Sequence, residues 1–125
     1  MFEEFQRLSR YLRAPELLDS KKNYDESVDI WSLGCIIFNM VTGIPPFYDS
    51  DENQMYCMIR MGKYEGQIGD YDKNSSEDLK SLISKMICID PKDRISSEDL
   101  FQDKWITSAN QRHKYLSKAI VSIIY

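Results

Sequence analysis

The pattern of hydrophobic and polar positions predicts a series of helices separated by polar loops. The longest apolar run, residues 28–42 (VDIWSLGCIIFNMVT), has apolar side chains on every side of a helical wheel, so we expect a helix that is buried all round. Gly43 then supplies a C-cap, and Pro45-Pro46 stops any continuation. The β-branched residues of this run also allow a strand, but its length and the stop signals favour the helix.

Shorter patterns on either side predict two more helical segments. Residues 14–18 (APELL) fit a short helical turn, because proline is tolerated in the first turn of a helix. The polar residues 19–27 that follow indicate a loop. Residues 52–61 predict a second helix, which ends at Gly62. Residues 62–75 hold three glycines without periodicity and indicate a long loop.

Three further helices are predicted in the C-terminal half of the chain. The first is capped by Ser75 or Ser76. Its apolar stripe consists of Leu79, Leu82, Ile83, Met86 and Ile87. Ser96 or Ser97 caps a short helix, and a last helix runs from about Gln111 to the end. The stripe of that helix consists of Tyr115, Leu116, Ala119, Ile120, Ile123 and Ile124. The whole pattern predicts an all-α domain.

Composition and charge are those of a soluble globular protein, with 42% hydrophobic and 29% charged residues. A length of 125 residues suits one domain. The formal net charge of −4 argues against binding to nucleic acid, which needs clustered Lys and Arg. No stretch approaches the ~20 apolar residues of a membrane span, and the acidic start lacks an apolar signal segment. We therefore expect an intracellular protein, cytoplasmic or nuclear, that binds neither nucleic acid nor membrane.

The sequence matches no metal-binding or nucleophilic catalytic motif. The cysteines lie too far apart for a zinc site or a disulfide framework, so we expect buried free thiols at Cys35, Cys57 and Cys88. The acidic stretches that begin at Asp49 and Asp70 depart from a calcium loop at its sixth and twelfth positions. The single histidine, His113, has no acidic or nucleophilic neighbour on its helical face. We therefore expect no metal site and no nucleophilic catalytic set.

Four motifs, in order and at matching separations, resemble the C-terminal part of a eukaryotic Ser/Thr protein kinase domain. Residues 9–16 (SRYLRAPE) resemble the end of an activation segment, and residues 29–34 (DIWSLG) resemble the start of the family's buried central helix. Residues 43–47 (GIPPF) and residues 90–96 (DPKDRIS) are the third and fourth motifs. The resemblance covers roughly residues 8–107 and implies the helical C-lobe of a protein-kinase-like fold.

The details of these motifs resemble one subgroup of kinases. Residues 24–26 (YDE), the GIPPF segment and residues 94–98 (RISSE) are similar to the calmodulin-dependent group, and most of all to its calcium-dependent members. Residues 110–125, basic and then amphipathic, resemble the junction segment that follows the catalytic domain in those kinases. We therefore divide the chain into a partial kinase domain over residues 1–109 and an amphipathic helical tail over residues 110–125.

The resemblance implies structural roles for four residues. Glu16 closes the activation segment, and its carboxylate is expected to pair with Arg94. Asp29 opens the central helix. The resemblance implies that its carboxylate accepts hydrogen bonds from backbone N–H groups, including those of the catalytic loop. Because that loop is missing here, we expect Asp29 to find water or a local partner. Trp31, like Gly34 on the same helix, is expected to be a packing residue.

Three residues of the activation segment stand at positions that meet substrate in the family. Ser9 occupies the place of a threonine that contacts the catalytic Asp and Lys. Leu12 stands where a tyrosine is usual, and Leu12-Arg13 corresponds to the loop that meets the residue after the phosphoacceptor. Leu8 also replaces the usual glycine. These departures weaken the expectation that the chain docks substrate as its relatives do.

The sequence contains none of the residues that phosphoryl transfer requires in the family. No His-Arg-Asp and no Asp-Phe-Gly occurs, and a glycine-rich cover and paired Lys are also missing. The chain itself should therefore hold no ATP or Mg, although the intact family uses both, and we expect no kinase activity from it alone.

Two hypotheses follow for what the chain does. It is either an inactive kinase fragment, whose partner is the missing N-terminal half of the kinase, or an interaction module that docks a protein substrate or another partner. The basic amphipathic tail, residues 110–125, also fits a target of a calmodulin-like protein, although a helix packed on its own domain explains the same pattern.

Overall fold

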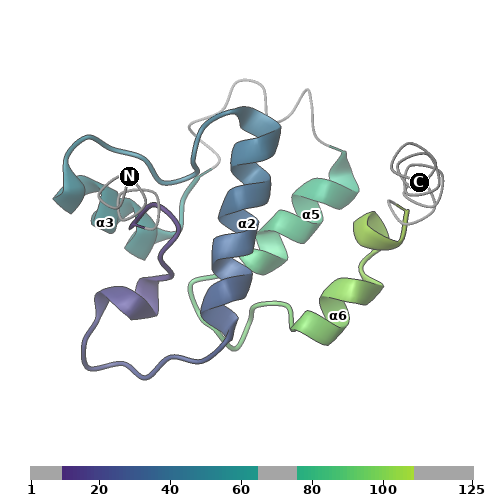
Figure 1. Ribbon diagram of the computed structural model, residues 1–125, viewed down its shortest axis with the longest axis horizontal. Coiled ribbons are helices and arrows are strands. Elements are labelled where there is room, and N and C mark those ends of the chain that lie inside the picture. The colour runs from purple at the N-terminus through teal and green to yellow at the C-terminus, as the bar shows by residue number, and fades with distance from the viewer. Residues whose placement is uncertain (1–9, 65–75, 109–125) are drawn as a thin grey trace, which may run out of the picture. The chain divides into compact units, whose positions relative to one another are not determined.

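The computed structural model describes residues 10–64 and 76–108, and those residues form helices and loops with no strand (Figure 1). The elements are the 3-10 helix η1 (Pro15–Leu18) and the α-helices α2 (Ser27–Thr42), α3 (Glu52–Met61), α5 (Glu77–Met86) and α6 (Ser97–Gln102). The expected all-α class is therefore confirmed for these residues. Ser9, Leu8, most of the 62–75 loop and the predicted tail helix with its calmodulin-type expectation lie outside them.

The helix ends follow the local signals in the sequence. Gly43 and Gly62 end α2 and α3 in the left-handed conformation, with φ values of 80° and 64°, which glycine adopts without a Cβ penalty. The hydroxyl of Ser76 accepts a hydrogen bond from the N–H of Leu79 and so caps α5. Ser96 caps α6 in the same way, through the N–H of Asp99. Ser76 and Ser96 are thus the caps among the paired alternatives.

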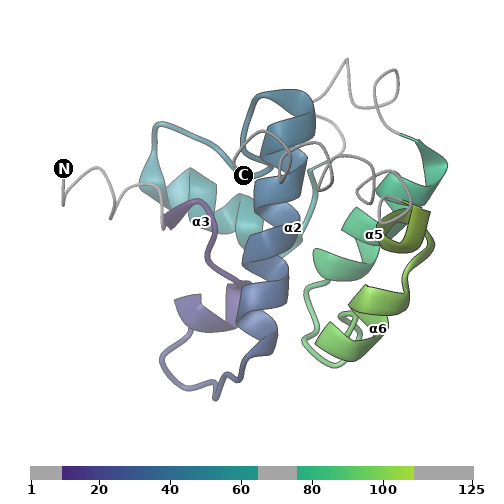
Figure 2. The same cartoon turned by 45° about the vertical axis from the view of Figure 1, so that its right-hand side comes forward.

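Contacts divide the chain into two compact units, residues 1–95 and residues 96–125. In the first unit α2 packs against α5, and η1 packs against α3 (Figures 1 and 2). The predicted stripe of α5 is buried along its whole length, from Leu79 to Ile87. Helix α2 meets α5 at Gly34, where an added Cβ would lie 2.9 Å from both Ile87 Cγ1 and Met86 Cβ. The absence of a side chain at Gly34 therefore permits this close approach.

An aromatic cluster fills the core of the first unit. Trp31 stacks on Phe47, with ring centroids 5.4 Å apart and 12° between the planes. Tyr64 meets both Phe38 and Phe47 edge to face, an arrangement that aromatic quadrupoles favour. All four rings are buried. The Pro-Pro-Phe motif thus brings Phe47 back onto the helix that precedes it.

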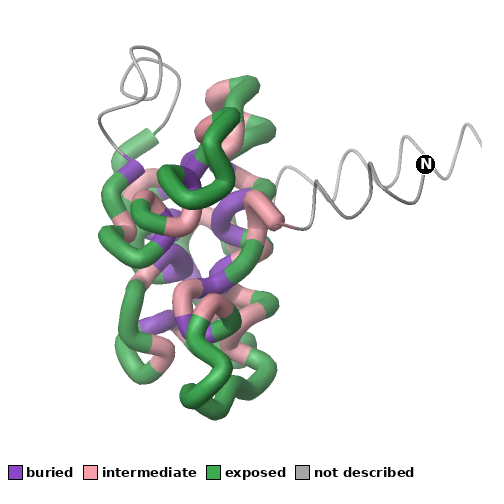
Figure 3. Tube along the Cα trace, turned by 90° about the vertical axis from the view of Figure 1, so that its left-hand side faces the viewer, coloured by how far each residue is buried: buried purple, intermediate pink, exposed green. Residues whose placement is uncertain are grey.

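The expectation that the central helix is buried all round is wrong. Trp31, Gly34, Cys35 and Phe38 face the core. Leu33, Ile36 and Met40 lie on another side and are 38%, 41% and 80% exposed. Figure 3, coloured by burial, shows buried and exposed residues alternating along the chain. The helical wheel correctly marked both sides as apolar, but only neighbouring elements decide which side is covered.

The second unit holds α6 and a further helical stretch that begins at Lys104. Asp103 lies between them and is buried. Its backbone N–H donates to the carbonyl of Leu100, and its carboxylate accepts from the N–H of Trp105. Asp103 thus ends one helix and caps the next.

Candidate functional site

A buried ion pair joins two segments of the first unit that are far apart in the sequence. Arg94 Nη1 and Nη2 donate to the two carboxylate oxygens of Glu16, each at 2.7 Å. The side chains are 1% and 4% exposed, respectively. The guanidinium fork matches the geometry of a carboxylate, so the pair is bidentate and charge-assisted. The pairing that the resemblance implied for Glu16 and Arg94 is present.

Arg94 does more than pair with Glu16. Its Nε donates to the carbonyl of Cys88 at 2.7 Å, while Nη1 and Nη2 also reach the carbonyls of Ser27 and Ile89 at 3.3 Å. All five N–H groups of the guanidinium therefore have acceptors. One side chain thus links η1, the start of α2 and the loop after α5.

Trp31 lies under the same guanidinium. The Arg94 carbon Cζ is 5.1 Å from the centre of the Trp31 ring, which is within the range of a cation–π interaction. The ring itself is fully buried against Phe47, as expected of a packing residue. Its Nε1 has no hydrogen-bond partner among the residues that the structure describes.

Ser32 anchors the segment that leads into η1. Its hydroxyl donates to the carbonyl of Leu12 at 2.6 Å, so α2 holds the backbone of this segment in place. Sequence reasoning included Ser32 in the DIWSLG motif but assigned it no role. A serine within a buried helix was the available signal, because its hydroxyl needs an acceptor.

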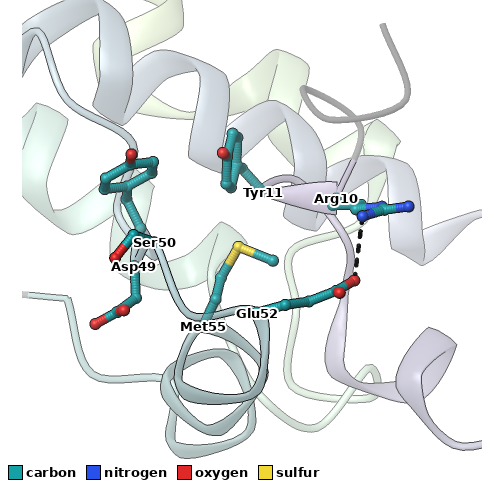
Figure 4. Close-up of a pocket in the computed structure, with 7 residues that line it drawn as sticks. Arg10, Tyr11, Asp49, Ser50, Glu52 and Met55 are labelled. Carbon is teal, nitrogen blue, oxygen red and sulfur yellow. Dashed lines mark ion pairs between the residues drawn. The ribbon is translucent and has the colours of Figure 1, made fainter. Parts of the chain in front are cut away.

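The anchored segment forms one wall of a pocket of about 380 Å³ (Figure 4). The other walls come from the loop after α2 and from the start of α3. The lining residues are Arg10, Tyr11, Tyr48, Asp49, Ser50, Glu52 and Met55. Two tyrosine rings, Tyr11 and Tyr48, contact each other with centroids 5.3 Å apart. The pocket therefore combines aromatic and thioether surface with charged groups at its edge.

Glu52 is the most connected charged group of the pocket. Its Oε1 lies 3.3 Å from Arg10 Nη1, and the dashed line in Figure 4 marks this ion pair. The same oxygen accepts a hydrogen bond from the hydroxyl of Tyr56 one turn later on α3. Hydrogen bonding to Glu52 raises the pKa of the Tyr56 hydroxyl above its usual value, so Tyr56 stays protonated and remains a donor.

The loop before α3 is held in shape by its own aspartates. Asp49 Oδ1 accepts from the N–H of Asp51 at 2.8 Å, and Asp51 Oδ1 accepts from the N–H of Asn53. Asp51 thereby caps α3. The acidic residues that failed the calcium-loop pattern therefore serve as a turn and a helix cap, which position Glu52 beside the pocket.

The other site residues that the sequence predicted and the structure describes lie outside the pocket lining. Leu12 is half-buried and Arg13 is exposed, and neither lines the pocket. Asp29 is exposed in the first turn of α2, so water can reach its carboxylate. Sequence reasoning predicted none of the seven lining residues as binding residues, although Arg10 and Tyr11 lie directly before Leu12. Nothing in the sequence shows which residues of an irregular segment face a distant helix.

The expectation of three buried thiols is right only for Cys35. Cys35 is buried, Cys88 is half-buried and Cys57 is exposed on α3. Burial raises the pKa of the Cys35 thiol to about 12 and also raises that of Cys88. Within residues 10–64 and 76–108, no cluster of three or more His, Cys, Asp or Glu could hold a metal ion. No helix in those ranges is long and apolar enough to cross a membrane.

Comparison with known proteins shows the family of this chain. The sequence profile of the family described as "Protein kinase domain" matches residues 3–106 of this chain. This chain belongs to the protein kinase domain family. The helices described above are accordingly part of the helical C-lobe of a kinase domain.

Curated kinases agree with the subgroup that the motifs indicated. Calcium-dependent protein kinase 19 of Oryza sativa subsp. japonica is 32% identical over 114 residues, which is 91% of this chain and 21% of that protein. The calcium/calmodulin-dependent protein kinase type II alpha chain of Drosophila melanogaster is 36% identical over 93 residues, or 74% of this chain and 17% of that protein.

A third relative, calcium/calmodulin-dependent protein kinase type 1 of Caenorhabditis elegans, is 35% identical over 94 residues. These cover 75% of this chain and 26% of that kinase. The chain thus spans about a sixth to a quarter of the length of these kinases, and it is a fragment of a kinase domain that resembles the calcium- and calmodulin-dependent kinases.

Proposed function

We propose that this chain is a docking lobe of a Ser/Thr kinase, which binds a segment of a protein substrate at the Arg10–Met55 pocket and does not transfer phosphate by itself. The observation that carries the proposal is the place of the pocket. One wall is the segment directly before Ala14-Pro15-Glu16, which resembles the end of an activation segment, and another wall is the start of α3.

Rigid supports on both sides favour a binding role for this pocket. Ser32 fixes the backbone of the activation segment at Leu12, and the Glu16–Arg94 pair fixes its end. On the opposite side the two aspartate turns hold the start of α3. A pocket whose walls are already in place costs little ordering when a ligand enters.

Phosphoryl transfer needs groups that this chain does not supply. A kinase positions ATP and Mg²⁺ with a glycine-rich loop, a Lys–Glu pair, a catalytic Asp and metal-binding Asp and Asn residues. The sequence of this chain contains no motif that supplies them. Loss of one donor from such a site already costs about 10²–10³ in rate, so loss of all of them together abolishes turnover.

Two measurements on the purified chain test the two halves of the proposal. Incubation with radiolabelled ATP, Mg²⁺ and a mixture of protein substrates should transfer no label, and stoichiometric ATP binding with turnover would contradict the inactivity. Fluorescence anisotropy should show saturable binding of octapeptide mixtures, and the variant Tyr11→Ala/Tyr48→Ala should weaken that binding. A complete lack of peptide binding by the folded chain would contradict the docking function.

A second candidate function rests on the exposed side of α2. Leu33, Ile36 and Met40 follow one another at helical spacing and present apolar surface to solvent. Exposed apolar residues that share one helix side are typical of an interface. This surface suits the other half of a kinase domain as partner, which is the interaction-module hypothesis.

Complementation tests this second function. The chain should co-elute with a separately produced ATP-binding half of a calcium-dependent protein kinase, and Ile36→Glu should prevent this without lowering the melting temperature of the chain alone. Glu98→Lys, an exposed change in the second unit, is the control. Unchanged co-elution of the Ile36→Glu variant would contradict the proposed partner.

A further inference from the structure

We propose that Glu52 is the subsite for a cationic side chain of the docked peptide, and that Arg10 occupies this subsite in the free chain. This inference rests on the docking function proposed above and specifies its selectivity. Binding would then be an exchange of one cation for another on the same carboxylate. Arg10 would act as a specificity-determining residue, because it sets the threshold that an incoming side chain must exceed.

The existing ion pair between Arg10 and Glu52 is weak. Arg10 and Glu52 meet through a single contact of 3.3 Å, and their side chains remain 42% and 51% exposed. Exposed pairs of this kind contribute only about 0–1 kcal/mol. The contrast with the bidentate, buried Glu16–Arg94 pair is large, so Arg10 is displaceable whereas Arg94 is not.

The pocket lining carries more negative than positive charge. Asp49 and Glu52 contribute two carboxylates to the pocket, and Arg10 contributes the only cation among its seven lining residues. When Arg10 swings away, two negative charges remain with no compensating positive charge in the lining. An incoming lysine or arginine restores the balance, whereas an incoming glutamate would meet like charges.

The pocket surface beside the Glu52 carboxylate is aromatic and apolar. Met55 is 2% exposed and lines the pocket together with Tyr11 (Figure 4). The rings of Tyr11 and Tyr48 contact each other in the same lining. The methylene stem of a lysine or arginine packs well on such surface while its charged head stays near water. Tyrosine faces also attract cations. The pocket thus matches both parts of a long basic side chain.

The carboxylate itself is held in place for this exchange. The Tyr56 hydroxyl donates to the same oxygen of Glu52 that Arg10 contacts. Tyr56 lies one turn further along α3, so this hydrogen bond does not depend on Arg10. Glu52 therefore keeps its position when Arg10 leaves, and the incoming cation finds an oriented acceptor.

The experiment uses the full chain and three octapeptide mixtures whose central residue is fixed as lysine, norleucine or glutamate while the other positions are randomised. Fluorescence anisotropy should give the order lysine, norleucine, glutamate in affinity. Arg10→Gln should raise the affinity for the lysine mixture roughly two- to fivefold, which corresponds to the strength of an exposed ion pair. Glu52→Gln should remove the preference for lysine over norleucine.

Glu77→Gln is the matched control, because Glu77 is also an exposed helix-start glutamate with one lysine partner and lies outside the pocket. It should change none of the three affinities, and thermal melting should confirm that all variants are folded. Equal binding of lysine and norleucine mixtures, or weaker lysine binding in Arg10→Gln, would overturn the inference while leaving the docking function intact. No binding of any mixture would instead contradict the docking function itself.

Discussion

Glu16 and Arg94 are 78 positions apart in the sequence, and their side chains form two parallel hydrogen bonds of 2.7 Å each in the interior of the protein. Glu16 lies in η1, and Arg94 follows the helix that packs against α2. This contact therefore ties the wall of the candidate pocket to the core of the lobe.

Removing either partner should destabilise the chain strongly. We expect Glu16→Gln to lower the free energy of unfolding by about 3–5 kcal/mol, because a buried guanidinium then lacks its counter-charge. Arg94→Met should cost more, since three backbone carbonyls lose their donor as well. Urea denaturation measures both. Glu77→Gln removes a carboxylate whose side chain is 91% exposed, and it should cost less than about 1 kcal/mol. Equal costs at the two sites would contradict this interpretation of the buried pair.

Gly34→Ala should destabilise the contact between α2 and α5. The new methyl would lie 2.9 Å from both Ile87 Cγ1 and Met86 Cβ, and Met86 Cβ cannot move without its helix. Overpacking of this kind costs about 1–3 kcal/mol, measurable as a lower urea midpoint. A second change, Ile87→Ala, should not restore the stability, because the clash with Met86 persists. Full recovery in that double variant would show that the contact is softer than the packing indicates.

Ser32→Ala should loosen the wall of the pocket more than it lowers global stability. The loss of a hydrogen bond to the Leu12 carbonyl should cost about 0.5–1.5 kcal/mol. The same change should speed hydrogen exchange at residues near Leu12 and weaken octapeptide binding. Ser84→Ala, whose hydroxyl donates within its own exposed helix turn, serves as control. Unchanged peptide affinity in Ser32→Ala would mean that the anchor does not support the pocket.

Alkaline pH should destabilise the chain through Cys35. Burial raises the pKa of this thiol to about 12, against an ordinary value of 9.0. Above pH 9 the unfolded chain loses this proton while the folded chain keeps it, so the free energy of unfolding should fall between pH 9 and about 12. Cys35→Ala should flatten this part of the profile relative to the unmodified chain, and Cys57→Ala should not. Identical slopes for the two variants would exclude Cys35 as a cause.

Thiol labelling provides an independent check on the same burial. At neutral pH iodoacetamide should modify Cys57 first, because it is exposed on α3, and Cys35 only after denaturation. Peptide mapping by mass spectrometry distinguishes the sites. Early labelling of Cys35 in the folded chain would contradict its placement in the core.

The sequence by itself determined the features that depend on near neighbours. The central helix over about residues 28–42 and its end at Gly43 follow from the length of the apolar run and from the backbone freedom of glycine. Serines before α5 and α6 supply side-chain acceptors within a few residues, and the structure selects Ser76 and Ser96 from the two pairs. The buried stripe of α5 follows from its helical spacing. The kinase resemblance added the Glu16–Arg94 pairing, which no local pattern contains.

Only the tertiary structure decided which faces are covered and which segments meet. It left one apolar side of α2 exposed, joined Ser32 to Leu12, and brought Arg10 and Tyr11 against α3 to form the pocket. Helical periodicity reports which residues share a face but not what lies opposite that face. Contacts between distant segments depend on the path of the whole chain, and for this reason the candidate site became visible only in three dimensions.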